Sequence, residues 1–122
     1  GGENMIGGAP ESMKGLAPPL AIPSGQLPPE ILTGIITSTQ TGAVTGTLDT
    51  GANMDLAFPN AQAGDAIDWV LINLGSSSGA VTVTASTGHT IVGNAVVAIA
   101  TSGIFRSRKT AADTWVTYRI AG

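Results

Sequence analysis

Apolar and polar residues alternate along most of the chain after residue 31. The segment AVTVTAS sets Val81 and Val83 against threonines, as in a strand with one face in water. In AIDWVLINLG both alternating sets are largely apolar, which is typical of a strand near the middle of a sandwich. Segments rich in Thr, Ile and Val predict further strands over 32–39 and 43–49, because branched side chains fit a pleated surface.

The last third of the chain predicts more strands and a closing hairpin. HTIVG and AVVAIA are short strand segments, and SGIFRSRK and TWVTYRI are joined by a turn around residues 110–113. We expect a register that sets Phe105 beside Tyr118 and Ser107 beside Val116 on the inner face. The outer face then pairs Arg106 with Thr117 and Arg108 with Trp115, where an arginine over an indole ring contributes roughly 0.5–1 kcal/mol.

One segment between these strands is ambiguous. In NMDLAFPN, Met54, Leu56 and Phe58 alternate, which predicts a short strand that ends at Pro59. No segment shows helical periodicity. Short strands about ten residues apart with glycine-rich turns predict an all-β fold, a small antiparallel β-sandwich of the jelly-roll type over residues 31–122.

Residues 1–30 differ in composition from the rest. They hold six of the seven prolines, with glycines between them, and therefore predict an extended arm close to polyproline II. The alternative is a disordered tail. Its apolar residues that could anchor the arm to a partner are Leu16, Leu20, Ile22 and Leu27.

Composition narrows the classes of function. The 122 residues suffice for one small domain, and only 11% are charged, so we expect other chains to cover much of the weakly polar surface. A net charge of −3 argues against general nucleic-acid binding. The absence of cysteine excludes disulfides and zinc–thiolate sites. No apolar run approaches the ~18 residues of a membrane helix, and no signal peptide is visible, which favours synthesis in the cytoplasm followed by assembly.

Candidate chemistry is sparse. LDTGA matches the Asp-Thr-Gly loop of aspartic proteases, with Asp49 as the carboxylate, but the same residues are ordinary turn chemistry. His89 follows a turn, and we expect it to be exposed without a role. Asp65 is predicted to cap a turn, and Asp68 to pair with an arginine or protect a sheet edge. The sequence therefore predicts no catalytic residue, no cofactor and no metal, and the protein is not expected to be an enzyme.

The half of the chain from Phe58 to Ile120 resembles a module of tailed-bacteriophage virion proteins. The shared pattern is a Gly-Asp turn, an aromatic strand ending in Ile-Asn-x-Gly, a Val/Thr strand, Thr-Ile-Val-Gly, Ser-Gly-x-Phe-Arg-x-Arg-Lys-Thr and a terminal Tyr-Arg-Ile, all present here. The resemblance implies a β-sandwich that assembles as a homotrimer, in a capsid decoration (cement) protein or in a head- or tail-fibre domain. Arms such as residues 1–30 lie along neighbouring subunits in virion proteins of this kind.

Two functions follow as expectations. In the first, the protein decorates the capsid surface of the virion, and its arm residues Leu16, Leu20, Ile22 and Leu27 bind the major capsid protein. In the second, it is a fibre module that binds host glycans through Trp115, with Arg108 and Arg119 nearby. Neither involves nucleic acid or a membrane.

Overall fold

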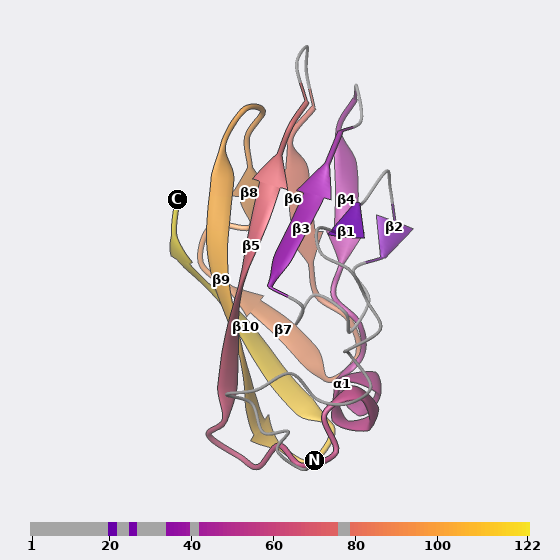
Figure 1. Cartoon of the computed structure of the whole chain (residues 1–122). Helices are drawn as coiled ribbons and strands as arrows, with labels where there is room; N and C mark the ends of the chain where they lie inside the picture. The colour runs from indigo at the N-terminus through magenta and orange to yellow at the C-terminus, as the bar shows by residue number, and fades with distance from the viewer. Residues whose placement is uncertain (1–19, 22–24, 27–33, 40–41, 76–78) are drawn as a thin grey trace.

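The strands alternate between two sheets along the chain. The computed structural model describes residues 20–21, 25–26, 34–39, 42–75 and 79–122. The six-stranded sheet contains, in spatial order, β1 (Leu20–Ala21), β3 (Ile35–Ser38), β5 (Ala66–Asn73), β9 (Ser102–Ala111), β10 (Thr114–Ala121) and β7 (His89–Val92). The four-stranded sheet contains β2 (Gly25–Gln26), β4 (Val44–Thr47), β6 (Val81–Thr84) and β8 (Val96–Val97). The two sheets lie one behind the other, which confirms the all-β sandwich (Figure 1).

This alternation makes the sheets mixed, not purely antiparallel as expected. Because successive strands from β1 to β6 lie in opposite sheets, strands two apart in sequence become neighbours in this part of the chain. Thus β1, β3 and β5 run parallel in one sheet, and β2, β4 and β6 run parallel in the other. The antiparallel pairs are β5 with β9, β9 with β10, and β6 with β8.

The strand predictions over 32–39 and 43–49 are confirmed by β3 and β4 within the described residues. The arm expected over residues 1–30 contributes two short strands to the sandwich of its own chain. Strand β1 pairs with β3 and β2 pairs with β4, each through two residues. Leu20 thus lies in β1, opposite Ile36. The anchor predictions for Leu16, Ile22 and Leu27 fall outside the described residues.

The core lies between the sheets. It contains Ile36, Leu48, Met54, Phe58, Ala61, Trp69, Leu71, Val81, Val83, Val97, Phe105 and Trp115, all buried. Strand β5 occupies the middle of the six-stranded sheet, as its sequence predicts, and turns Trp69 and Leu71 inward. Trp69 stacks on Phe105, with ring centroids 4.6 Å apart. Such offset aromatic pairs add about 0.5–1.5 kcal/mol beyond the area they bury.

The short strand predicted at Met54, Leu56 and Phe58 is wrong. Residues Gly51–Ala57 form helix α1, which covers one end of the sandwich (Figure 1). Met54 and Phe58 are four residues apart, so both point into the core, whereas Leu56 is 76% exposed. The Thr50 side chain caps the helix by accepting a hydrogen bond from the Asn53 amide at 3.1 Å.

The predicted hairpin is present, but its register is wrong by one residue. Ser107 lies opposite Thr117, and Arg108 lies opposite Val116 rather than Trp115. The cause is an irregularity beside the turn, where the pairing shifts between Thr114 and Trp115. A shift of one residue moves every side chain to the other face, so Trp115 points inward.

Candidate functional site

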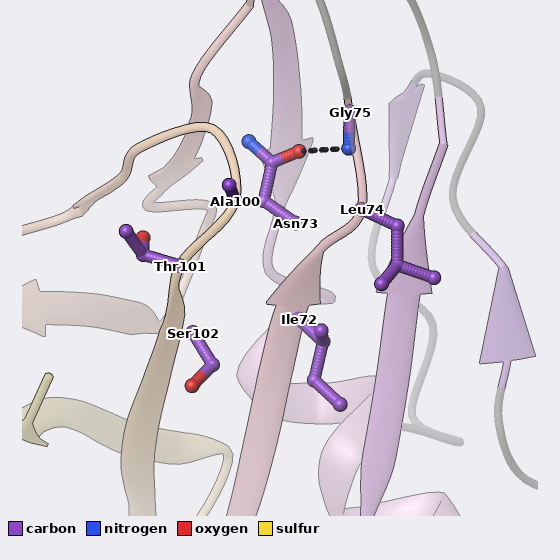
Figure 2. A pocket seen from close by; sticks show the side chains of 7 residues that line it. All are labelled: Ile72, Asn73, Leu74, Gly75, Ala100, Thr101 and Ser102. Carbon is purple, nitrogen blue, oxygen red and sulfur yellow. Dashed lines mark hydrogen bonds between the residues drawn. The ribbon is translucent and has the colours of Figure 1, made fainter.

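A pocket of about 320 Å³ opens at the end of the six-stranded sheet, where β5 ends and β9 begins (Figure 2). Its lining residues are Ile72, Asn73, Leu74, Gly75, Ala100, Thr101 and Ser102. Leu74 is 54% exposed, so one wall of the pocket is a protruding apolar side chain.

Asn73 holds the wall of this pocket together. Its Oδ1 accepts a hydrogen bond from the Gly75 amide at 2.9 Å (Figure 2). Its Nδ2 donates to the carbonyls of Gly79 and Val97, at 3.0 and 3.1 Å. One buried amide therefore ties the end of β5 to the following segment and to β8 of the other sheet. These three hydrogen bonds explain the asparagine of the Ile-Asn-x-Gly motif, because they need one acceptor and two donors on a single short side chain.

The facing wall is a tight turn before β9. The Thr101 amide and hydroxyl both donate to the Ala98 carbonyl, at 3.2 and 2.7 Å. Ala100 has a φ of 61°, in the left-handed region. The pocket lining holds hydroxyl groups and no ionisable side chain. It can therefore receive an apolar group, and its own residues supply no acid, base or charged nucleophile.

The Asp-Thr-Gly segment is the start of helix α1. The Asp49 carboxylate accepts hydrogen bonds from the Thr50 amide at 2.7 Å and from Asn53 Nδ2 at 2.8 Å. Gly51 packs so closely that a Cβ added there would lie 2.0 Å from the Asp113 carbonyl. The segment thus caps a helix and seats it under the β9–β10 hairpin.

His89 is buried, so the expectation of an exposed loop histidine is wrong. It belongs to a chain of hydrogen bonds across the inner face of the six-stranded sheet, which we term the core hydrogen-bond chain. Trp69 Nε1 donates to Ser107 Oγ at 2.9 Å, and Ser107 Oγ lies 2.7 Å from Thr117 Oγ1. Thr117 Oγ1 lies 2.7 Å from His89 Nε2, and His89 Nδ1 lies 2.8 Å from the Asp49 carbonyl oxygen.

Only one arrangement of hydrogens satisfies the whole chain. The Asp49 carbonyl can only accept, so His89 carries its hydrogen on Nδ1 and accepts at Nε2 from Thr117. Thr117 then accepts from Ser107, which accepts from the Trp69 indole. A proton added at Nε2 would turn this nitrogen into a donor and leave the Thr117 hydroxyl without its acceptor. Burial lowers the pKa of His89, while the nearby Asp49 carbonyl and carboxylate raise it less, so the ring stays neutral.

Trp115, predicted as an exposed recognition residue, is fully buried, so that prediction is wrong. Its Nε1 donates to Asp55 Oδ1 at 2.7 Å, and Asp55 Oδ2 accepts from the Asp113 amide at 2.8 Å and lies 3.1 Å from Lys109 Nζ. Burial raises the pKa of Asp55, but the bonds from Asp113, Trp115 and Lys109 together hold it below its ordinary value. Asp55 therefore fastens α1 to the hairpin.

Arg119 is also occupied within the fold. Its Nη1 donates to the carbonyls of Asn94 and Val96, both at 3.0 Å, and its guanidinium lies 5.3 Å from the Phe105 ring centroid. Gly103 leaves room for this side chain, because a Cβ there would lie 2.7 Å from Arg119 Nε. Of the three residues proposed for surface recognition, Arg108 alone is exposed and makes no ion pair with another described residue.

The two carboxylates at the start of β5 act as predicted for turns and ion pairs. Asp65 Oδ2 accepts from the Gln62 amide at 2.9 Å and closes a turn. Asp68 binds Arg106 through two hydrogen bonds, at 2.6 and 2.9 Å. The Arg106 bonds lower the pKa of Asp68. Both side chains of this pair are about half exposed, which limits it to under ~1 kcal/mol.

Searches for other kinds of site in the described part of the chain give clear results. No group of three or more His, Cys, Asp or Glu side chains there is placed to hold a metal ion. No helix among the described residues has the length and hydropathy needed to span a membrane. Comparison of the chain with protein-family models, with curated proteins and with solved structures gives no match.

Sequence reasoning missed the core hydrogen-bond chain and the helix clamp at Asp55. Thr117 and Asp49 bond to His89 from 28 and 40 residues away, so no local pattern marks them. The cap of α1 was visible in principle, because Thr50 is a favoured capping residue and the following Met54 and Phe58 have helical spacing.

Proposed function

We propose that this chain is a structural, non-enzymatic virion protein that binds the shell of a tailed-bacteriophage head as a decoration, or cement, protein. One observation carries the proposal: within the described residues, the side chains that were the strongest candidates for chemistry are used to build the fold. His89, Asp49 and Asp55 each have their polar atoms engaged by neighbours inside the sandwich or at its helix. A protein built in this way acts through its surfaces.

The residues that resemble phage virion modules support the same proposal, because they form the joints of the sandwich. The Gly64–Asp65 turn bonds to β9 in both directions, with the Gly64 amide donating to the Lys109 carbonyl and the Lys109 amide donating to the Asp65 carbonyl. Asn73 joins the two sheets. The resemblance is therefore one of architecture, which is what a family of assembly modules would share.

In this proposal the major capsid protein is the partner, the capsid surface of the virion is the location, and the assembled form is a trimer. The arm supplies the contacts, with Leu16, Leu20, Ile22 and Leu27 as apolar anchors. The backbone of Leu20 also pairs with β3 of the same chain. Many weak contacts repeated over linked copies give avidity without a strong single site.

The test is co-sedimentation of the purified protein with heads of the phage whose genome encodes it. The full chain should bind these heads and should raise their resistance to heat, and heads of an unrelated phage serve as the control. A chain that lacks residues 1–19 keeps every described strand and loses the anchor Leu16, so it should fold but bind heads more weakly. If the full chain fails to bind heads from which the protein is missing, the proposal is wrong. If the shortened chain binds as well as the full one, residues 1–19 have no role in binding.

The glycan-binding alternative loses its main residue. Trp69 and Trp115 are both buried in the core, so neither offers a platform for a sugar ring. We therefore do not carry this alternative forward.

A further inference from the structure

The turn that precedes β7 connects this edge strand to the start of helix α1 and to β10 (Figure 1). The Gly51 amide donates a hydrogen bond to the Thr87 carbonyl at 2.9 Å, and the Trp115 amide donates to the Gly88 carbonyl at 2.8 Å. His89 follows directly, and its ring extends these connections into the core. The ring therefore lies where an edge strand, a helix start and the closing hairpin meet.

A count of hydrogens shows why this ring is sensitive to acid. The core hydrogen-bond chain has four contacts, which join Trp69, Ser107, Thr117, His89 and the Asp49 carbonyl in that order. With a neutral histidine the groups along the chain carry one hydrogen for each contact. A protonated ring adds one more hydrogen without adding an acceptor. The four side chains are buried, so water does not accept this extra hydrogen.

The charges near His89 do not compensate for this loss. The Asp49 carboxylate raises the pKa of His89, but burial lowers it more. The other ionisable groups on the elements beside β7 are Asp55, Lys109, Asp113, Tyr118 and Arg119. None of them bonds to the ring, because both ring nitrogens are engaged by Thr117 and the Asp49 carbonyl. The closed protein therefore binds this proton less readily than an open one, in which water surrounds the ring.

The turn beside His89 also contains a buried hydroxyl without a partner. Ser86 Oγ is buried and makes no hydrogen bond within the described part of the chain. The backbones of Ser86 and His89 bond to each other in both directions, at 2.9 and 3.1 Å, so the two residues open together. A buried hydroxyl without a partner destabilises the closed form relative to an open form that water reaches. This turn is therefore a weak point of the closed fold.

The position of β7 in the sheet favours a local opening. Strand β7 has four residues and pairs only with β10, in parallel register, and helix α1 has seven residues. Strands β5 and β9 have eight and ten residues and a neighbour on each side. Short elements at an edge open at a lower free energy than long central strands.

We propose that His89 is a pH-sensitive switch: a proton taken up by its ring breaks the core hydrogen-bond chain and releases β7 and the start of α1, while the central strands stay folded. Acid thus opens one end of the sandwich reversibly. This proposal goes beyond binding to a shell, because the switch acts within a single chain and needs no head.

The test is amide hydrogen exchange of the full chain at about pH 7 and about pH 5, expressed as protection factors to remove the intrinsic pH dependence of exchange. At both pH values, amides of β7 and α1 should be at least ~10-fold less protected than those of β5 and β9. With a pKa of about 6.5 for the open form, the opening constant at β7 should rise up to about 25-fold between the two pH values.

Two variants separate His89 from the other groups that titrate. His89→Gln does not titrate in this range, and its protection at β7 should not depend on pH in this way. Thr90→Val is the matched control, because it changes an exposed residue of the same strand and keeps the histidine. Its protection at β7 should respond to pH as in wild type. Circular dichroism establishes that each variant is folded.

A second measurement needs no variant, because His89 is the single histidine of the chain. Its ring nitrogens give one set of NMR signals, which should show the neutral form with its hydrogen on Nδ1 at pH 7. Signals of the protonated ring should grow as the protection of β7 falls.

Three results would overturn the proposal. In the first, the ring takes up its proton while β7 keeps its protection. In the second, β5 and β9 are no better protected than β7, so that opening is global. In the third, folded His89→Gln shows the same pH response as wild type. Head binding enters none of these measurements, so failure of the proposed function leaves this test unaffected.

Discussion

Removing the Thr117 hydroxyl should destabilise the fold more than its small size suggests. Thr117→Val keeps the shape of the side chain but removes both the donor to His89 Nε2 and the acceptor of the Ser107 hydroxyl. Thr117, Ser107 and His89 are all fully buried, so water does not replace these bonds. Each of the two buried groups left without a partner costs about 1–3 kcal/mol, giving about 2–6 kcal/mol in total.

Urea unfolding followed by tryptophan fluorescence measures this loss, because Trp69 and Trp115 are both buried in the native state. The loss is large beside the about 5–15 kcal/mol of a typical domain, and it should move the midpoint with an unchanged slope. The matched control is Thr90→Val in β7, where the same change at an exposed threonine should stay within about 0.5 kcal/mol. The reasoning fails if Thr117→Val costs no more than Thr90→Val.

Three further predictions concern the same region. Because burial lowers the pKa of His89, the unfolded chain takes up a proton before the folded one as the pH falls below about 6.5. The free energy of unfolding of wild type should therefore fall by up to about 1.4 kcal/mol per pH unit in that range. Unfolding of His89→Gln measured against pH should lack this contribution. Asp55→Asn should lower the free energy of unfolding, measured with urea, by about 1.5–3 kcal/mol. Asp113→Asn changes an exposed side chain and should have almost no effect. Equal effects of the two changes would mean that Asp55 does not fasten the helix to the hairpin. Gly51→Ala should lower the melting temperature strongly, because the new Cβ would meet the Asp113 carbonyl. Gly42→Ala should leave the melting temperature unchanged, because no atom lies within 4 Å of a Cβ at that position. A Gly51→Ala protein as stable as wild type would contradict the close packing.

The sequence predicts the parts of this fold that depend on neighbouring residues better than those that depend on residues far apart in the chain. The alternation in AIDWVLINLG predicted the strand, because period two is a local property, but with both sets largely apolar it did not say which set faces the core. The same alternation gave a wrong strand at Met54, Leu56 and Phe58. The four-residue spacing of Met54 and Phe58 fits a helix equally well, and the cap at its start favours the helix. The hairpin register depends on an irregularity beside the turn, which side-chain periodicity does not report.

The candidate site shows the same division. Asp68 was predicted to pair with an arginine, and Arg106 fills that role from the neighbouring strand. Trp115 was placed on the wrong face, because a one-residue error in register exchanges the two faces of a strand. The pocket at Leu74 depends on two chain segments that meet only in the folded protein, so no local pattern predicts it.

The core hydrogen-bond chain also bears on the outer face. Trp69, Ser107, Thr117 and His89 come from β5, β9, β10 and β7, which are successive neighbours in the six-stranded sheet. A slip of one residue between any two of these strands would turn a bonded side chain to the other face and break a buried hydrogen bond at that boundary. The same register that aligns the buried polar groups sets Val70 beside Ile104 on the opposite face. The inner chain therefore also fixes the register of the outer face, which gives a buried polar network in a small hydrophobic core a structural purpose.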